Sequence, residues 1–548
     1  MSLSYSHGAS STELLGETIG ANLRRAAAQY PTAEVLVDVP TGRRWTYAQF
    51  DAETDVLARG LISRGLMPGD RVGIWAPNCA EWVQLQYATA KAGIILVNIN
   101  PAYRSHELSF ALRQSGVRVL VSAESFKTSD YRAMVYEVRS KLPALEDVVY
   151  VGTPAWDALF AAGQAEASQG ADLAAREASL SFDDPINIQY TSGTTGFPKG
   201  ATLSHHNILN NAYFIGEGCK YTEHDRVCIP VPFYHCFGMV LGNLACTTHG
   251  ACIVIPAPGF DPAQTLRTVQ AEHCTSLYGV PTMFIAELAL PDFADYDLTT
   301  LRTGIMAGSP CPVEVMKRVV SEMHMTEVTI CYGMTETSPV STQTTADDDM
   351  ERRVSTVGRV HPHVEVKVTD PETGRVLPRG VPGELCTRGY SVMLGYWDEP
   401  AKTAEAIDAA RWMHTGDLAV MDQAGYLNIV GRIKDMVIRG GENVYPREIE
   451  EFLYAHPAIE DVQVIGVPDQ KYGEELCAWI KLRPGQELSE DDVKEYCRGK
   501  IAHFKIPRYV RFSADFPMTV TGKVQKFKMR DTSIAELGLT AESEIKTA

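Results

Sequence analysis

Hydrophobic and polar residues alternate in two recognisable patterns along the first part of the chain. The run Thr46-Tyr47-Ala48-Gln49 matches a helix capping box, and Phe50, Leu57 and Leu61 follow on one helical face. Short continuous apolar runs predict buried strands, and an amphipathic helix is expected between the first two, from Glu81 to Lys91. These runs span residues 71–76, 94–99 and 117–122. The alternation predicts helices packed on mostly parallel sheets.

The pattern changes toward the C-terminus. Pro446 is a favourable first helical residue, and Ile449 and Leu453 after it lie on one apolar helical face. Two strand-like runs follow, and then a helix that begins near Ser489. The runs span residues 462–467 and 477–482. Residues 435–548 are therefore predicted to form a small α+β domain.

Length and charge limit the classes of function. A chain of 548 residues is too long for a single hydrophobic core and predicts at least two domains. The formal net charge of −18 argues against nucleic acid as a general partner, because no excess of Lys and Arg exists to neutralise phosphates. A few local cations suffice for a small anion, so ATP and CoA are compatible with this charge.

The cysteines and the N-terminus indicate a reducing compartment. The twelve cysteines include no Cys-x-x-Cys pair, so a zinc site is not expected, and some lie in apolar runs such as 250–255. Residues 1–20 hold no Lys or Arg and no continuous apolar run, so we expect no secretory or transit signal. No segment reaches the ~20 apolar residues that span a bilayer. The expected location is cytoplasmic, without an integral membrane segment.

The stretch from Thr191 to Gly200 has the clearest chemistry. Its three glycines allow close backbone approach, its hydroxyls add donors, and Lys199 adds a positive charge, which together suit a polyphosphate. It is not a Walker A loop, because Pro198 stands where that motif needs glycine and Gly200 follows the lysine. A glycine-rich turn considered alone is more often only a turn.

Two segments downstream add groups that suit a nucleotide. After an apolar strand, Tyr332 can stack on a purine, Thr335 can donate to phosphate, and Glu336 can give Mg²⁺ one hard oxygen ligand. Only one carboxylate is expected, since Mg²⁺ keeps water molecules and takes further oxygens from the nucleotide. Asp417 can accept hydrogen bonds from both ribose hydroxyls, and Arg432 can reach ribose or phosphate. Each residue alone also fits a turn, a helix start or a surface arginine.

This order of motifs resembles the adenylate-forming superfamily of acyl-CoA synthetases, adenylation domains and luciferases. The match runs from about Trp45 to Lys526 and looks most like the medium-chain fatty-acid–CoA ligase branch. The segments nearest to that branch are 203–207, 440–446 and 503–507. The resemblance implies a large α/β AMP-binding domain with a β-barrel-like subdomain (1–433), a hinge at Lys434 and a mobile α+β C-terminal domain (435–548).

The resemblance also implies an activity. ATP and a carboxylic acid form acyl-AMP and pyrophosphate, and CoA then takes the acyl group with release of AMP. Lys523 is the expected adenylation lysine, while Lys526 and Lys528 nearby lack its Thr-Gly context. Rotation of the C-terminal domain about Lys434 is expected to remove Lys523 from the site and bring in a CoA-binding loop.

The residues carried over from this family fall into four groups. The catalytic residues are Lys523, Glu336, Thr335 and His235, with Glu336 as the Mg²⁺ ligand. The ATP- and AMP-binding residues are Thr191, Ser192, Gly193, Thr194, Thr195, Lys199, Gly308, Ser309, Tyr332, Gly333, Asp417 and Arg432. The CoA-binding residues are Arg439, Gly440, Gly441 and Glu442, and the acyl-pocket residues are Phe237, Met239, Gly304, Met306 and Val340.

Several alternatives stay open at this point. The resemblance favours a medium-chain fatty acid, and the lack of an assignable cation for a second carboxylate favours an apolar tail. Branched, aromatic and sulfur-containing acids are alternatives. A carrier protein is an alternative acceptor, although the sequence shows no carrier domain after the small domain. Luciferase-like oxidation and an inactive nucleotide-binding module acting through partners are further alternatives. A homodimer is the default expectation for assembly.

Overall fold

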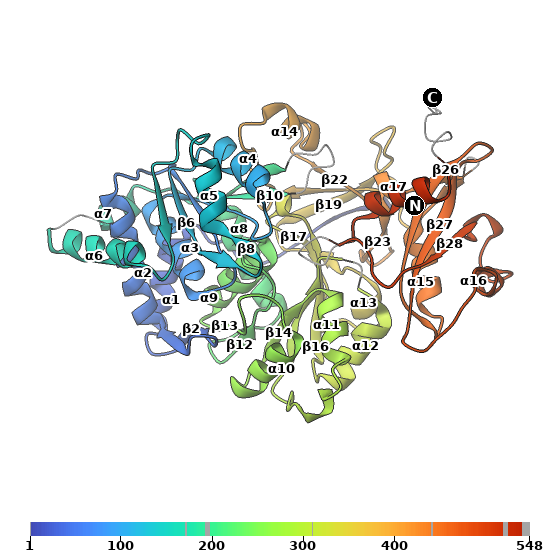
Figure 1. The fold of residues 1–548 in the computed structure, drawn as a ribbon, viewed down its shortest axis with the longest axis horizontal. Helices are drawn as coiled ribbons and strands as arrows, with labels where there is room; N and C mark the ends of the chain where they lie inside the picture. Colours follow the sequence, from blue (N-terminus) through green and yellow to red (C-terminus); the bar gives the residue numbers. More distant parts are fainter. Residues whose placement is uncertain are drawn as a thin grey trace. The chain divides into compact units, whose positions relative to one another are not determined.

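Contacts within the chain group it into two units (Figure 1). The computed structural model describes residues 2–169, 173–191, 198–309, 311–439, 442–518 and 524–539, without the side chains at 166–169 and 442–443. The larger unit comprises Ser6–Val366 and Thr387–His414, and the smaller unit comprises Met1–Tyr5, Lys367–Cys386 and Thr415–Ala548. Residues 415–433, expected in the N-terminal domain, therefore group with the C-terminal residues.

The predicted strands near the start of the chain belong to a sheet of seven strands in the larger unit (Figure 1). In spatial order these are β21 (Gly395–Tyr396), β11 (Lys199–Ser204), β10 (Pro185–Thr191), β5 (Ile95–Asn98), β4 (Arg71–Trp75), β6 (Val119–Ser122) and β9 (Asp147–Tyr150). The pairs from β10 to β9 are parallel, whereas β11 pairs antiparallel with both β10 and β21. The prediction of a mostly parallel sheet is confirmed.

A second sheet of the larger unit has nine strands. In spatial order these are β18 (Arg359–Val360), β17 (Val340–Gln343), β16 (Glu327–Gly333), β15 (Thr303–Ala307), β14 (Ser276–Gly279), β12 (Arg226–Cys228), β13 (Cys252–Ile255), β2 (Glu34–Asp38) and β3 (Arg43–Thr46). The strands from β16 to β2 run parallel, and antiparallel pairs close both edges.

Side chains alternate between the two faces of each sheet and so build three hydrophobic clusters. The largest contains residues of both sheets together with α3 (Ala80–Ala92), α8 (His205–Gly218) and the π-helix η1 (Phe237–Leu244). On the other face of the nine-stranded sheet lie α10 (Pro262–Ala271), α11 (Pro281–Leu288) and α12 (Val313–Glu322). On the other face of the seven-stranded sheet lie α4 (Ser105–Ser115) and α5 (Tyr131–Arg139).

Further helices complete the larger unit. They are α1 (Ile19–Gln29), α2 (Tyr47–Ser63), α6 (Pro154–Gln169), α7 (Leu173–Ala178), α9 (Ala245–His249), α13 (Met350–Ser355) and α14 (Pro400–Ala406), with short turns η2 (Phe293–Asp295) and η3 (Thr335–Thr337) and a hairpin of β7 (Ser125–Phe126) and β8 (Ser129–Asp130). Helix α2 has the predicted capping box between Thr46 and Gln49. Phe50, Leu57 and Leu61 on this helix are fully buried, as predicted.

Helix α3 corrects one expectation. The amphipathic helix predicted from Glu81 to Lys91 is present, but every residue of α3 is buried. Its charges are paired in the interior instead of facing solvent. The Lys91 ammonium lies 2.6 Å from a carboxylate oxygen of both Asp51 and Asp55, and Glu81 pairs with Arg43 at 2.7 Å. The prediction of a solvent-exposed face is wrong because these partners come from other elements.

The smaller unit contains the predicted α+β arrangement. Its sheet has the order β25 (Glu442–Val444), β24 (Val437–Arg439), β27 (Gly473–Leu482) and β26 (Ile459–Asp469), and β28 (Tyr509–Phe512) pairs parallel with β27. Around it lie α15 (Pro446–Tyr454), α16 (Glu490–Cys497) and α17 (Lys526–Glu536), with short turns η4 (Ile433–Asp435) and η5 (His503–Lys505) (Figure 1). Pro446 opens α15 and Ser489 caps α16, as predicted.

A further sheet of the described chain has five strands. Its order is β1 (Tyr5–His7), β19 (Val364–Thr369), β20 (Gly383–Gly389), β22 (Met413–Met421) and β23 (Leu427–Arg432). All twelve cysteines are free, and all except Cys79 are buried, as small hydrophobic residues are. Within the described part of the chain, every helix is too short or too polar to span a bilayer.

Candidate active site

The predicted metal ligand Glu336 lies at the centre of a contact network in the larger unit. Strand β16 ends at Gly333, and Glu336 follows in turn η3 with 5 % of its surface exposed. Its Oε1 accepts a 2.8 Å hydrogen bond from the Tyr396 hydroxyl and a 3.4 Å bond from the Thr191 hydroxyl. Its backbone carbonyl accepts a 2.9 Å bond from the Met393 amide. These contacts place the carboxylate beside the end of β10, where the predicted phosphate loop begins.

Tyr396 connects Glu336 to the lysine of the predicted phosphate loop. The Lys199 ammonium lies 4.7 Å from the centre of the Tyr396 ring, within the range of a cation–π contact. Burial and the neighbouring Glu336 carboxylate raise the pKa of the Tyr396 hydroxyl, so it stays protonated and donates to that carboxylate. Strand β21 holds the ring in place, because Tyr396 pairs with Ala201 on β11. Sequence reasoning missed Tyr396.

Close backbone packing or a positive φ requires glycine at two positions of this region. A Cβ at Gly333 would lie 1.7 Å from the carbonyl oxygen of Pro339, so no side chain fits there. Gly308 follows β15 with a φ of +91°, a conformation that favours glycine, and Ser309 comes directly after it. Tyr332 is half-buried within β16, and Thr335 is 6 % exposed at the start of η3.

Three of the predicted acyl-site residues lie in or next to the π-helix η1: His235, Phe237 and Met239. His235 precedes this helix, and its Nδ1 accepts a 3.2 Å bond from the amide of Phe237. Met239 accepts two bonds at its sulfur, from Gln189 at 3.0 Å and from Asn98 at 3.2 Å. These two polar residues sit on neighbouring strands, β10 and β5. A π-helix inserts an extra residue into a helical turn and is frequent at functional sites.

Two of the predicted acyl-pocket residues do not join this group. Phe237, Met239 and Val340 belong to the cluster between the two sheets. Met306 packs in the other cluster, under α11 and α12, because it alternates with Ile305 along β15. Gly304 lies on the same face as Met306, since a Cβ there would lie 2.5 Å from the side chain of Met325, which belongs to the same cluster. The alternation of side chains along β15 therefore places Gly304 and Met306 on the opposite face of the sheet from Phe237, Met239 and Val340.

The smaller unit brings together the two predicted ribose-binding residues. Asp417 on β22 and Arg432 on β23 are direct cross-strand partners. Their side chains meet at 3.1 Å between the arginine Nε and the aspartate Oδ1. Half of the Arg432 side chain is exposed, whereas Asp417 is mostly covered. The pair therefore offers a carboxylate held in place by a cation that remains accessible.

The expected hinge and CoA-binding residues lie farther along the smaller unit. Lys434 is exposed in turn η4. The Arg439 guanidinium donates to Glu475 at 2.8 Å and lies 5.3 Å from the centre of the Tyr472 ring. Glu442 pairs with Arg439 through the backbone of β25 and β24. Seven other predicted residues lie outside the described residues: Ser192, Gly193, Thr194, Thr195, Gly440, Gly441 and Lys523.

The competing lysine Lys526 has a structural partner. Its ammonium lies 2.6 Å from Glu450 and donates to the Val464 carbonyl oxygen at 3.1 Å. Glu450 also accepts from the Val464 amide at 2.7 Å, so this pair ties α17 to α15 and β26. A lysine held in this way is poorly suited to reach a substrate.

Comparison with protein families assigns the chain. The profile described as "AMP-binding enzyme" matches residues 23–397, and the profile described as "AMP-binding enzyme C-terminal domain" matches residues 448–523. The chain belongs to the AMP-binding enzyme family. The first match contains Thr191, Lys199 and Glu336, so the contact network around Glu336 lies inside the family's own segment.

Similar proteins cover nearly the whole of this AMP-binding enzyme. YngI of Bacillus subtilis (strain 168), assigned as an acyl-CoA synthetase, is 51% identical over 96% of this chain and 99% of its own. The mitochondrial medium-chain acyl-CoA ligase ACSF2 of Danio rerio is 47% identical over 98% of this chain and 92% of its own length. The crystal structure of ATP-bound MatB from Rhodopseudomonas palustris has a TM-score of 0.82 and 30% identity, over 95% and 99% of the two chains.

These likenesses confirm the predicted family, fold and enzyme class. The chain is an AMP-forming acid–thiol ligase of the acyl-CoA synthetase type. Small-molecule substrates agree with this family, and ATP and CoA are the nucleotide substrates that its members use. The individual roles of the site residues remain predictions.

Proposed function

We propose that this enzyme activates a medium-chain fatty acid to acyl-AMP and then to acyl-CoA. Its likeness to the medium-chain ligase ACSF2 over nearly the full chain supports this choice of acid. The side chains of Phe237, Met239 and Val340 are buried and uncharged, which favours an apolar tail. The observation that carries the proposal is the hydrogen bond from Tyr396 to Glu336, which orients a buried carboxylate beside Thr191 at the end of β10.

In the first half-reaction, the fatty-acid carboxylate attacks the α-phosphorus of ATP. The bond between the α-phosphorus and the bridging oxygen breaks, and pyrophosphate leaves. Lys199 neutralises charge on the phosphates, and Thr191 donates a hydrogen bond at the start of their loop. Catalysis is positioning and charge stabilisation, and no covalent enzyme intermediate is needed.

Glu336 fits the role of a Mg²⁺ ligand. The two hydrogen bonds that described side chains make to it both end on Oε1, and a single buried carboxylate is what a Mg²⁺ shared with a triphosphate requires. When bound, Mg²⁺ supplies positive charge that stabilises the departing pyrophosphate. Asp417 accepts the ribose hydroxyls, and Arg432 holds that carboxylate in position. Lys523 brings the carboxylate oxygen and the α-phosphate together.

In the second half-reaction, the CoA sulfur attacks the carbonyl carbon of acyl-AMP. The bond between that carbon and the phosphate oxygen breaks, and AMP leaves. We infer that residues 435–548 rotate about Lys434, which withdraws Lys523 and presents the loop from Arg439 to Glu442 to CoA. His235, next to the π-helix, lies between the acyl pocket and the thiol path in this proposal.

A cytoplasmic location and a homodimeric assembly complete the proposal. The dimer follows from the general preference of soluble enzymes for two-fold symmetry. Light scattering of the purified enzyme at several concentrations measures the assembly, and a mass equal to one chain at every concentration would contradict it.

The decisive experiment measures pyrophosphate release across acids from butyrate to palmitate, with benzoate and a branched acid included. Each methylene that the pocket buries raises kcat/KM by about fourfold, so the rate climbs with chain length until the pocket is full. We expect the highest kcat/KM with a medium-chain acid. We also expect CoA to accept the acyl group. A maximum at benzoate, or transfer to a carrier protein and not to CoA, would replace this proposal.

A further inference from the structure

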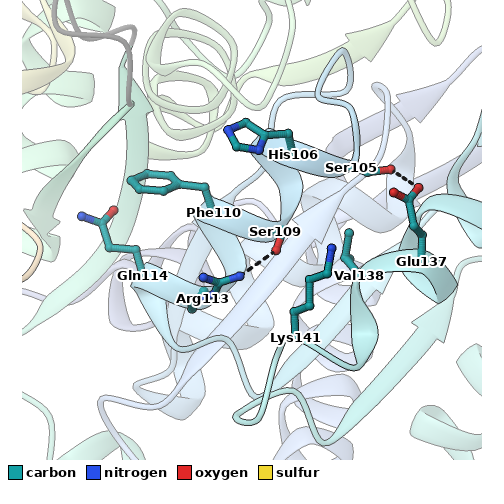
Figure 2. Close-up of a pocket in the computed structure, with 9 residues that line it drawn as sticks. All are labelled: Ser105, His106, Ser109, Phe110, Arg113, Gln114, Glu137, Val138 and Lys141. Atoms are coloured by element: carbon teal, nitrogen blue, oxygen red, sulfur yellow. Dashed lines mark hydrogen bonds between the residues drawn. The ribbon is translucent and has the colours of Figure 1, made fainter.

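A cavity of about 550 Å³ opens between α4 and α5, on the outer side of the seven-stranded sheet (Figure 2). This volume is within the range of pockets that hold small organic ligands. Its lining comes entirely from the larger unit and contains none of the residues predicted to bind ATP, CoA or the acid. A ligand in this cavity therefore occupies a place that the proposed reaction does not use.

Two cations enter the middle of the cavity. Arg113 on α4 and Lys141, just after α5, are exposed and line it from opposite sides (Figure 2). The Arg113 guanidinium donates a 3.2 Å hydrogen bond to the Ser109 hydroxyl. Among the described residues, neither cation forms an ion pair with a carboxylate. In a chain with a net charge of −18, two cations in one concave surface make a local site for a multiply charged anion.

The remaining lining is amphipathic. Phe110 and Val138 offer apolar contact, and Gln114 adds an amide on the same side as Phe110 (Figure 2). At the other side Ser105 donates a 2.6 Å bond to the Glu137 carboxylate, so this end of the cavity is acidic and an anionic group belongs with the two cations. An inorganic anion would leave the apolar part of this cavity unfilled. The lining matches a molecule with an anionic head and a flat or apolar body.

We propose that the cavity between α4 and α5 binds an organic phosphate. Its phosphate group lies between Arg113 and Lys141, where a guanidinium fork and an ammonium can bind several oxygens at once. Its body covers the ring of Phe110 and the side chain of Val138. A phosphate monoester carries up to two negative charges, which matches the two cations better than a single carboxylate does.

The inner side of α4 connects this cavity to the predicted ATP site. Phe110 packs edge-on against Tyr190, with 6.3 Å between ring centres, and Tyr190 directly precedes Thr191. The Tyr190 hydroxyl also donates to a carbonyl oxygen of α4 at 3.0 Å. Gln114 donates to Glu399 at 3.2 Å, three residues beyond Tyr396. Helix α4 therefore contacts β10 and the segment just after β21, the two places that supply Thr191 and Tyr396 to Glu336.

Phenyl phosphate tests the site, because it has a phosphate and a ring but no nucleoside. We expect calorimetry to show saturable binding to the wild-type enzyme, and no comparable binding of inorganic phosphate or phenol. The double variant R113A/K141A should bind about a hundredfold more weakly, since each of the two lost charge-assisted bonds is worth about tenfold. Arg113→Lys keeps the positive charge, so its affinity for phenyl phosphate should fall less than that of the double variant.

The matched control is R132A/R139A, which removes two exposed arginines of α5 that do not line the cavity. It should bind phenyl phosphate like the wild type. Equal binding by R113A/K141A and wild type, or an inorganic phosphate affinity equal to that of phenyl phosphate, would overturn the proposal. Bound phenyl phosphate should also slow hydrogen exchange at β10, and unchanged exchange there would refute the connection to Tyr190. None of these readouts depends on the acid that the enzyme activates.

Discussion

The Tyr396 hydroxyl donates a 2.8 Å hydrogen bond to Oε1 of Glu336. The same ring lies 4.7 Å from the Lys199 ammonium, so one side chain contacts both the predicted metal ligand and the cation of the predicted phosphate loop. Tyr396 is 6 % exposed and Glu336 5 %, which strengthens both interactions because water screens them little. Tyr396 is thus placed to fix the direction of the Glu336 carboxylate before substrates bind.

Replacing this tyrosine should weaken adenylation without unfolding the protein. Tyr396→Phe keeps the ring over Lys199 but removes the hydroxyl that orients Glu336. A hydrogen bond to a charged group contributes about 1.5–3 kcal/mol, so kcat/KM for ATP should fall by about tenfold or more. Acid-dependent pyrophosphate release at varied ATP and Mg²⁺ concentrations measures this change.

Tyr131→Phe is the matched control. Its side chain is also buried, and its hydroxyl donates to the Pro101 carbonyl oxygen at 2.6 Å and not to Glu336. This variant should lose stability without a change in the KM for ATP. Equal kinetics for Tyr396→Phe and the wild type would show that the hydroxyl does not position the carboxylate.

Tyr396 also marks the limit of what the sequence reveals. Thr191, Lys199 and Glu336 are recognisable because each stands in a short run with its own chemistry. Tyr396 stands in no such run, and only the pairing of β21 with β11 brings it to Glu336. A contact created by strand pairing across almost 200 residues leaves no local pattern.

Strand direction and burial explain the other differences. The family resemblance assigns Gly304 and Met306 to the acyl pocket, whereas alternation along β15 turns them toward the cluster with α11 and α12. Helix α3 carries charged residues that indicate an exposed face, but Asp51 and Asp55 neutralise Lys91 inside the core. Local periodicity predicts the fold class. Which face of β15 or α3 is buried, and against what, depends on partners distant in sequence.

Substitution of Lys523 should affect the first half-reaction and spare the second. Lys523→Ala should abolish formation of acyl-AMP, because the variant lacks the cation that we propose joins the carboxylate to the α-phosphate. Thioester formation from supplied acyl-AMP and CoA should continue, since the proposed rotation withdraws Lys523 before that step. Pyrophosphate release and CoA thioester formation, measured separately, check this. Loss of both half-reactions to the same extent would contradict the role.

Lys526→Ala is the comparison for Lys523→Ala. Lys526 forms a 2.6 Å ion pair with the buried Glu450, and its removal leaves that carboxylate with less compensation. We expect a loss of stability on the order of 1–3 kcal/mol and nearly normal adenylation per folded molecule. If Lys526→Ala instead stopped adenylation, the assignment of the adenylation lysine would pass to Lys526.

The hinge should respond to a change in backbone freedom alone. Lys434 is the second residue of turn η4, and proline there restricts its own φ and disfavours the helical conformation of Ile433. Lys434→Pro should therefore keep adenylation and block thioester formation, whereas Lys434→Ala should keep both. Single-turnover assays of each half-reaction give the answer. An unchanged overall rate in Lys434→Pro would rule out a hinge at this residue.

Glu287 should make the stability of the protein depend on pH. It lies in α11 with 1 % of its surface exposed, and neither carboxylate oxygen has a hydrogen-bond partner among the described residues. Burial raises its pKa well above the ordinary value of 4.5, so the native protein keeps this proton after the unfolded chain has lost it. Stability therefore falls as pH rises above 4.5 toward the native pKa, by up to about 1.4 kcal/mol per pH unit.

Glu287→Gln removes that titration while preserving the shape of the side chain. As pH rises from 4.5 to about 7, the melting temperature of this variant should increase relative to that of the wild type. In acid the two melting temperatures should converge, because the wild-type carboxyl is then neutral in both the folded and the unfolded state. Glu314→Gln, on the exposed surface of α12, should follow the wild type throughout. A constant difference between Glu287→Gln and wild type at every pH would mean that a partner keeps the Glu287 carboxylate ionised in the folded protein.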